Sequence, residues 1–340
     1  MRREYTPESV FLIAGLGSIG RRHLRNLASL GHQGFLLYRT GRSILPEDEL
    51  SIYPVEYNLD AALARSPIAV IVSNPTSLHL DVAIPAARAG CHLFLEKPLS
   101  HNVERLDELS EAVKKGGGEV VMGFQFRFHP ALRTIKKLIS SNTLGRIMHI
   151  RCQWGEYLPA WHPWEDYRKS YSARRDLGGG VVLTLCHPID YLHWLFGEID
   201  WVNSHIANIS DLELEVEDTA EILLSFSNGI LADLHLDYIQ QPPQHTMEIT
   251  GTLGMVRWNN ADGIVNLYHH ENNAWEQLKP PRGFERNNMF LEEMRHFIQV
   301  VGGKEKSLCT LQAGILVQRV VDAIYRSAQS GQRVKITNSS

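Results

Sequence analysis

The sequence predicts an α/β protein of two domains, a doubly wound parallel sheet followed by a sheet that is mostly antiparallel. The chain has 340 residues, which suits two domains of roughly 100–200 residues each. As far as residue 122, short apolar runs alternate with helical patterns, which is typical of parallel strands joined by helices. From residue 147 onward, segments with period-two alternation follow one another, which indicates antiparallel strands.

The composition is that of an ordinary soluble globular protein, with 44% hydrophobic and 21% charged residues. The formal net charge is -4 and there is no basic run, so we expect no nucleic-acid partner. No apolar stretch reaches the ~18–20 residues of a membrane-spanning helix, and the polar N-terminus does not resemble a secretory signal. The four cysteines have neither metal-ligand spacing nor a disulfide framework, which favours reduced thiols in a cytoplasmic protein. They are Cys91, Cys152, Cys186 and Cys309.

The first strand and helix carry a glycine fingerprint. An apolar strand at 10–14 runs into Gly15-x-Gly17-x-x-Gly20, and a helical pattern then continues to a stop at Gly31. Gly15 permits a tight turn, Gly17 lets the backbone approach a phosphate, and Gly20 lets the helix pack close to the strand. The helix N-terminus offers unpaired N–H groups to the anion. An ordinary glycine turn is the alternative, but the strand–turn–helix order favours dinucleotide binding, and Ser18 and Ile19 are expected to contribute.

The second strand, 34–38, ends without an acidic residue. An acid at this position commonly holds the ribose hydroxyl of NAD. Here Tyr38 and Arg39 stand in its place, with Arg42 and Ser43 just beyond. A guanidinium favours a ribose phosphate, so the sequence predicts NADP(H) as the preferred cofactor, with NAD possible. The alternative is a solvated arginine after a strand.

Polar residues follow the next buried strands of the first domain. A third strand is expected at 51–57, a helix at 59–65 and a fourth strand at 68–72. Because ligands bind beyond the carboxyl ends of parallel strands, Ser73, Asn74 and Pro75 are expected to line the cofactor. His79 either contacts the ribose or faces solvent at a helix start.

A helix at 81–89 and a fifth strand at 91–95 lead to Glu96, Lys97 and Pro98. A lysine held at a strand end can hydrogen-bond a substrate hydroxyl and take part in proton transfer. A lone lysine at such a place is more often a surface residue.

These motifs together resemble the glucose–fructose oxidoreductase/inositol dehydrogenase family. They are the glycine fingerprint, Ser73-Asn-Pro-x-x-x-His79, Ala89-Gly90-x-His92 and Glu96-Lys97-Pro98. The resemblance implies a Rossmann domain, residues 1–126, and a C-terminal α+β domain on a large open, mostly antiparallel sheet, residues 127–340. It also implies cofactor contacts at Glu96 and Lys97, catalysis by Lys97, and a homodimer or homotetramer formed through the open sheet.

The chain then crosses to the second domain. A helix at 103–115 and a strand at 120–122 precede Arg127. It matches an arginine that the family places near the mouth of the active site, and we expect it to hold substrate. Gln125 stands where the family often has asparagine, a modest departure. A helix at 131–139 and an alternating strand at 147–154 follow.

Residues 154–180 mix tryptophan, arginine and hydroxyl side chains without a helical or strand period. Such a loop is costly to leave in water without a function. Aromatic faces stack on sugar rings and arginine forks bind carboxylate or phosphate, so Trp164 and Arg168 are predicted to hold substrate. Packing against the first domain or a partner subunit is the alternative.

His187 and Asp190 lie three residues apart on a predicted helix and therefore share one face. The resemblance implies that His187 is a proton acceptor or a substrate ligand, and we expect Asp190 to orient it. The family also has an aspartate about one turn before the histidine, where this chain has Thr184, and Pro188 replaces a common acid. These departures imply that catalysis is weakened, rerouted through Lys97 or lost, although Thr184 could still donate a hydrogen bond to substrate.

The remaining residues complete the second sheet. Asn228-Gly229 between two alternating flanks, 217–226 and 230–238, predicts a hairpin. Further strands are expected at 245–249, 255–258 and 264–268, and a short strand at 334–336. Helices are expected at 287–302 and 310–327, and they are expected to pack back toward the first domain. The pair His269-His270 has no acid at metal spacing, so no metal is expected.

The sequence as a whole predicts an NADP(H)-preferring oxidoreductase. It would transfer hydride between nicotinamide and a hydroxyl carbon of a sugar, nucleotide sugar or cyclitol. One alternative is a sugar hydrolase or epimerase that retains its nucleotide and oxidises its substrate only transiently. The other, motivated by Thr184, is a nucleotide-binding regulatory protein without catalysis.

Overall fold

The computed structural model describes residues 4–40 and 48–337, and the chain divides into two compact units. The first unit comprises residues up to Gln125 together with Glu285–Ile315, and the second comprises Phe126–Phe284 together with the residues from Leu316. The first boundary lies one residue before the expected one. Residues 285–315 lie within the expected second domain, whose C-terminal helices were expected to pack back toward the first, and they belong to the first unit.

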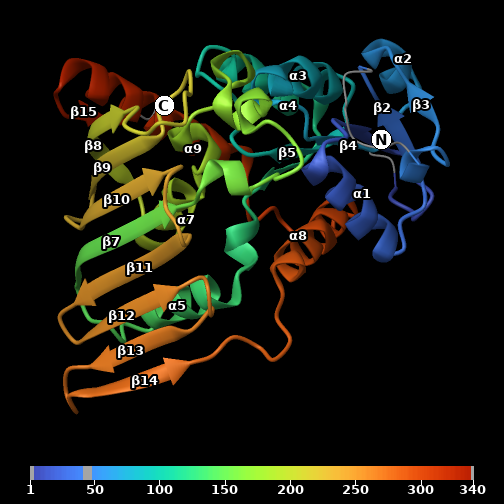
Figure 1. The fold of residues 1–340 in the computed structure, drawn as a ribbon. Coiled ribbons are helices and arrows are strands. Elements are labelled where there is room, and N and C mark those ends of the chain that lie inside the picture. The colour runs from blue at the N-terminus through green and yellow to red at the C-terminus, as the bar shows by residue number, and fades with distance from the viewer. Residues whose placement is uncertain (1–3, 41–47, 338–340) are drawn as a thin grey trace. The chain divides into compact units, whose positions relative to one another are not determined.

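The first unit is a Rossmann domain built on a six-stranded sheet in the order β3-β2-β1-β4-β5-β6 (Figure 1). All neighbouring strands are parallel. The central strands are fully buried, as sheets covered on both faces require. The strands are β1 Phe11–Ala14, β2 Phe35–Tyr38, β3 Val55–Glu56, β4 Ala69–Val72, β5 His92–Glu96 and β6 Val120–Gly123.

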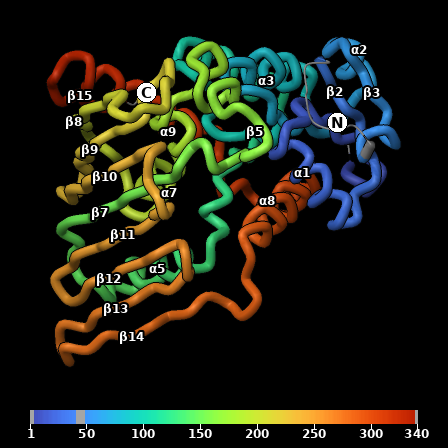
Figure 2. The backbone as a smooth tube through the Cα atoms, viewed as in Figure 1, coloured from blue at the N-terminus to red at the C-terminus, as the bar shows by residue number. Residues whose placement is uncertain are grey.

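Five α-helices lie wholly within the described residues of this unit. They are α1 Ser18–Ser29, α2 Leu59–Ala64, α3 His79–Arg88, α4 Leu106–Gly116 and α8 Arg286–Val301. Helix α8 lies beside α1 (Figure 2), and Asn287 donates to the Asn26 side chain at 3.0 Å. This contact explains why a helix from so late in the sequence joins the first unit.

The second unit is built on a nine-stranded sheet in the order β14-β13-β12-β11-β7-β10-β9-β8-β15. Strands β7 and β10 are parallel, and every other neighbouring pair is antiparallel. This confirms the mostly antiparallel sheet and the hairpin β9–β10. The strands are β7 Ile147–Gly155, β8 Ile199–Ala207, β9 Thr219–Phe226, β10 Leu231–Asp237, β11 Gln244–Gly251, β12 Gly254–Asn259, β13 Val265–His269, β14 Ala274–Leu278 and β15 Val334–Lys335.

Helices of the second unit lie on one face of this sheet, as Figure 1 shows for α5 and α7. They are α5 Pro130–Ser140, α6 Val181–Thr184, α7 His187–Phe196 and most of α9 Leu311–Ser330. Buried and exposed positions alternate along β9 and β10, because one sheet face packs against these helices. Outward positions include Leu223 and Leu231, which are 38% and 41% exposed.

The structure adds two strands that the sequence analysis did not predict, β8 and β14. It also shortens the third strand, expected over 51–57, to the two residues Val55–Glu56. All four cysteines are buried and unbridged. None of the described helices is long and apolar enough to cross a membrane.

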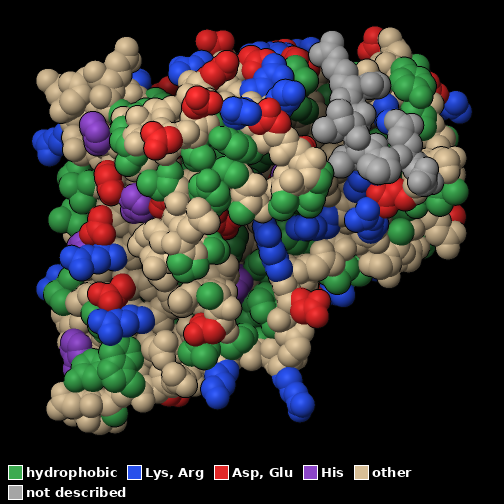
Figure 3. All heavy atoms as spheres, viewed as in Figure 1, with side chains coloured by type: hydrophobic (Ala, Val, Ile, Leu, Met, Phe, Trp, Pro, Cys, Tyr) green, Lys and Arg blue, Asp and Glu red, His purple; other side chains and the backbone are tan. Residues whose placement is uncertain are grey.

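Acidic and basic side chains are interspersed over the face of the molecule shown in Figure 3. This distribution agrees with the small formal net charge of -4.

His129 makes the second unit sensitive to acid. It is 1% exposed, and its Nδ1 accepts the Ala131 amide at 3.1 Å, which caps α5. Burial lowers the pKa of His129 to about 4, against a smaller raising effect of Asn260. Since the pKa in the folded protein lies below its ordinary value of 6.5, the resulting stability is complete above about pH 6.5 and is lost as the pH falls toward 4.

We therefore expect His129 to account for a loss of about 3 kcal/mol in the free energy of unfolding between these pH values. His129→Asn keeps a capping oxygen and cannot acquire charge. Urea unfolding at both pH values should show that the variant loses about 3 kcal/mol less than wild type on acidification. An equal loss in both proteins would show that His129 does not titrate as inferred.

Candidate active site

The glycine turn between β1 and α1 is closely packed against the end of β4. Gly15 has a φ of +92°, and a Cβ there would lie 2.2 Å from the Asn74 amide nitrogen. A Cβ on Gly20 would lie 1.9 Å from the Gly15 carbonyl oxygen. The Ser73 hydroxyl donates to that same carbonyl at 2.8 Å. Gly15 and Gly20 are therefore required by the fold of the turn itself.

Gly17 is different, because a Cβ at this position would meet no atom of the described residues within 4 Å. Gly17 is the N-cap of α1, and no side chain caps that end of the helix. Gly17 and Ser18 are exposed and Ile19 is half-buried. Open space beside an uncapped helix N-terminus is what a pyrophosphate needs, so these residues fit the phosphates of a dinucleotide.

Arg39 follows β2 directly, as expected, and its side chain is buried, with 9% exposed. Its amide donates to the Glu56 carbonyl at 3.1 Å, which ties this end of β2 to β3. The alternative of a fully solvated arginine is wrong. Arg42 and Ser43, which the sequence analysis placed beside it, lie outside the described residues.

His79 lies beneath the turn that follows β4. It is 2% exposed, and its two ring nitrogens lie 2.9 Å from the carbonyl oxygens of Asn74 and Pro98. Burial lowers the pKa of His79, although these carbonyls partly oppose the effect. The alternative of a solvent-facing His79 is wrong. The imidazole instead joins the turn after β4 to the Glu96-Lys97-Pro98 segment after β5.

A buried hydrogen bond fixes the residue before Lys97. Glu96 accepts from His23 at 2.6 Å, and both side chains are less than a tenth exposed. The other carboxylate oxygen of Glu96 accepts the Lys97 amide at 3.1 Å. Burial alone would raise the pKa of Glu96, but the bond from His23 and the charges of His23 and Lys97 lower it overall. The half-buried Lys97 thus stands on a rigid backbone, while Glu96 is committed to His23.

In the second unit, His187 begins α7 and lies against aromatic rings. Its ring centroid is 5.7 Å from that of Trp154, with an interplanar angle of 21°, and 5.1 Å from that of Phe126. Neither of these neighbours was expected from the sequence. Trp154 lies near the end of the alternating strand β7, and its position on the buried face was the available signal. The imidazole, 2% exposed, is held by packing.

Thr184 is the last residue of α6 and is 2% exposed. Its hydroxyl hydrogen-bonds Tyr238, whose own hydroxyl donates to the Ser172 carbonyl at 3.3 Å. Burial raises the pKa of Tyr238 well above its ordinary value, partly opposed by the Thr184 bond. Thr184 is therefore engaged by a neutral phenol.

Asp190 lies one turn after His187 and is 1% exposed. Its two carboxylate oxygens accept from the Arg127 guanidinium at 2.6 and 3.0 Å. The sequence analysis expected Asp190 to orient His187 and Arg127 to hold substrate. The structure shows the two residues bound to each other, because a guanidinium fork satisfies both oxygens of the buried carboxylate at once.

Trp164 and Arg168 lie among short 3₁₀ turns in the predicted loop. Trp164 is 70% exposed. Arg168 is half exposed and pairs with Asp166 at 3.0 Å and with Glu213 at 3.1 Å. Both residues remain accessible to a ligand.

A buried carboxyl that the sequence analysis did not single out, Glu217, supports α6. It accepts the Tyr325 hydroxyl at 2.7 Å and the Val182 amide at 3.3 Å. A Cβ on Gly180 would lie 2.4 Å from this carboxyl, so the glycine before α6 makes room for it. Burial raises the pKa of Glu217, partly opposed by the Tyr325 bond. No signal in the sequence distinguished this glutamate from its exposed neighbours.

Comparison with known proteins identifies the class. A model described as the NAD-binding Rossmann fold of an oxidoreductase family matches residues 10–124. A model of the same family's C-terminal alpha/beta domain matches residues 136–336. The protein is thus a nicotinamide-dependent oxidoreductase. The chain belongs to the glucose–fructose oxidoreductase/inositol dehydrogenase family.

Individual relatives span nearly the whole chain. The myo-inositol 2-dehydrogenase of Thermotoga maritima is 25% identical over 344 residues, covering 95% of this chain and 97% of that protein. The D-xylose 1-dehydrogenase (NADP(+)) 2 of Haloferax volcanii is 24% identical, with 85% and 87% covered. Levoglucosan dehydrogenase in complex with NADH superposes with a TM-score of 0.87 at 19% identity, covering 97% of this chain and 100% of that one.

Proposed function

We propose that this protein is a dehydrogenase or reductase that transfers hydride between nicotinamide and a hydroxyl carbon of a sugar or related polyhydroxy compound. The proposal rests on two features of the first unit. The glycine turn is open at Gly17, and the backbone that bears Lys97 is held by a hydrogen bond to Glu96. The names of the relatives, which act on inositol and xylose, support a sugar-like substrate.

The nucleotide, when bound, supplies or accepts the hydride at its nicotinamide ring. Gly15, Gly17 and Gly20, with the amides of Ser18 and Ile19, hold its pyrophosphate. Ser73, Asn74 and Pro75 line its ribose side. These assignments rest on the close packing of the turn and the open space at Gly17.

Lys97 donates a hydrogen bond to the substrate oxygen and polarises it. His187 takes the hydroxyl proton during oxidation and returns it during reduction. The Arg127–Asp190 pair acts by positioning, because it anchors the first turn of α7 on which His187 stands. Trp164 and Arg168 contact the substrate, and Thr184 acts through Tyr238.

We further propose that NADP(H) is preferred over NAD(H), with Arg39 as the determinant. Its cation follows β2 where an acid would select NAD. Arg39→Asp should lower the affinity for NADPH relative to NADH by about tenfold or more, because a charge-assisted contact becomes a repulsion. Calorimetric titration with both nucleotides measures the ratio. An unchanged ratio would remove Arg39 from the cofactor site.

The buried, unbridged cysteines suit a reducing compartment, and we propose that the protein works in the cytoplasm. We also propose a homodimer or homotetramer formed through the outer face of the second sheet. Exposed apolar side chains on that face, Leu223 and Leu231, support the proposal. Light scattering measures the assembly state.

The function is tested by titrating purified protein with NADH and NADPH, after its absorbance has been checked for nucleotide already bound. Exchangeable binding, followed by nicotinamide reduction with members of a sugar and cyclitol panel, is the expected result. Nucleotide that never exchanges would indicate the transient-oxidation alternative. Binding without any turnover would favour the regulatory alternative.

A further inference from the structure

A surface hollow of about 550 Å³ opens in the second unit, after the end of β7. The residues that line it are Arg168, Lys169, Arg174, Arg175, Asp176 and Glu215. All four cations come from residues 168–175. The lining carries a formal charge of +2, because four cations face two carboxylates.

The cationic side chains of this hollow form few strong ion pairs with the protein. Arg174 is bound by Asp176 through two hydrogen bonds, but the two side chains are 44% and 59% exposed. An ion pair this exposed adds little stability, so the guanidinium can exchange Asp176 for another oxyanion at small cost. Arg175 donates to the Glu215 carbonyl at 2.7 Å, and it forms no ion pair with any described residue.

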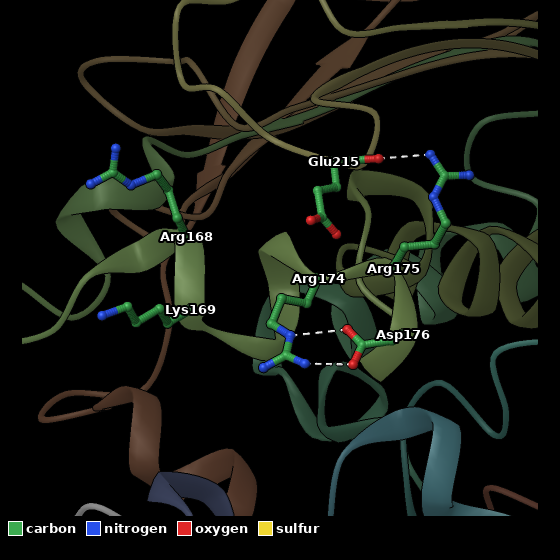
Figure 4. Close-up of a pocket in the computed structure, with 6 residues that line it drawn as sticks. All are labelled: Arg168, Lys169, Arg174, Arg175, Asp176 and Glu215. Atoms are coloured by element: carbon green, nitrogen blue, oxygen red, sulfur yellow. Dashed lines mark hydrogen bonds and ion pairs between the residues drawn. The ribbon is translucent and has the colours of Figure 1, made fainter.

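Figure 4 shows how these side chains are arranged. Arg174 and Asp176 lie between Arg175, which reaches toward Glu215, and Lys169 on the other side. The Lys169 ammonium extends outward in this view, and within the described parts of the chain it makes no hydrogen bond or ion pair. Its flexible stem allows it to turn toward a ligand.

We propose that this hollow binds the oxyanion group, phosphate or carboxylate, of an anionic sugar. Planar guanidinium forks bind such groups bidentately, and Arg174 and Arg175 bring two of them to one hollow. A volume of about 550 Å³ exceeds the needs of a single small ion and lies in the range of sites for small organic ligands. The inference rests on the proposed function for the sugar part of the ligand, and it narrows the substrate class to acidic or phosphorylated sugars.

The test compares the binding of glucose, glucuronate and UDP-glucose to the nucleotide-loaded protein by calorimetry. At least one charged probe should bind about tenfold or more tightly than glucose, and the advantage should shrink as salt rises. The stronger of the two identifies the oxyanion as carboxylate or diphosphate. If neither charged probe binds better than glucose, the proposal is overturned.

A double variant, Arg174→Gln with Arg175→Gln, should lower the affinity for the preferred charged probe by roughly a hundredfold and leave glucose unaffected. The matched control is Arg326→Gln, an arginine of α9 that is similarly exposed, 54%, and similarly paired with an acid. Unchanged affinity in the double variant would overturn the assignment. Tight binding of the anion without nicotinamide reduction would support the anion site and contradict the proposed dehydrogenase function. Turnover of neutral sugars with no preference for anionic ones would support the proposed function and contradict the anion site.

Discussion

Replacing Lys97 with alanine is expected to lower turnover by about 10²–10⁴-fold, the range for one positioned proton-transfer group. The backbone around Lys97 is held by β5 and by the bond of its amide to Glu96 at 3.1 Å, so truncation of the side chain leaves the segment in place. Nucleotide affinity should stay nearly unchanged, because the pyrophosphate contacts lie at the glycine turn. Steady-state kinetics and calorimetric titration measure the two quantities.

Lys115→Ala is the matched control for this experiment. Lys115 belongs to the same unit, is 78% exposed and pairs with Glu111 within α4. We expect no change in turnover for this variant. A loss of less than about tenfold in Lys97→Ala would remove Lys97 from proton transfer, and a large loss of nucleotide affinity would assign it to cofactor binding instead.

Removing Arg127 alone should be one of the most destabilising single changes in the second unit. Arg127→Met leaves the Asp190 carboxylate, 1% exposed, without its guanidinium, and we expect a cost of about 3–5 kcal/mol in the free energy of unfolding. Asp190→Leu should cost a similar amount, because it leaves the cation buried. Urea unfolding measures both.

The double variant Arg127→Met with Asp190→Leu tests the coupling of this pair. Two apolar side chains of similar volume can replace a buried ion pair at little cost, so the double variant should be more stable than either single variant. If its destabilisation equals the sum of the two single effects, the residues are not coupled. The double variant should also lower kcat more than it raises KM, because α7 then holds His187 less rigidly.

The sequence predicted the Rossmann sheet well because each central strand is a short, continuous apolar run bounded by a turn. The expected strand at 68–72, for example, is β4 Ala69–Val72. Two strands of the second sheet escaped prediction for the opposite reason. Strand β14 lies at the sheet edge and is almost wholly exposed, so it has no apolar periodicity. Strand β8 is mostly half-exposed and shows no clean alternation.

The site residues that could be predicted are those marked by a local sequence pattern. Gly15, Gly17 and Gly20 lie in a single turn, and Lys97 follows a strand end, so local patterns were sufficient to identify them. The partners of these residues were not predictable. Glu96 meets His23 from 73 positions away, and Asp190 meets Arg127 from 63, and no local pattern encodes such pairings. Asp190 was expected to orient His187, but its buried carboxylate instead forms an ion pair with the Arg127 guanidinium.

The most direct test of hydride transfer by this protein is to trace deuterium from the reacting carbon of a labelled sugar to the nucleotide. Nuclear magnetic resonance reports where the deuterium lies after incubation with the enzyme and added oxidised nucleotide. The account predicts that it appears at carbon four of the released nicotinamide, in step with formation of oxidised sugar. Deuterium that stays in the sugar, while no reduced nucleotide is released, would contradict net hydride transfer by this protein.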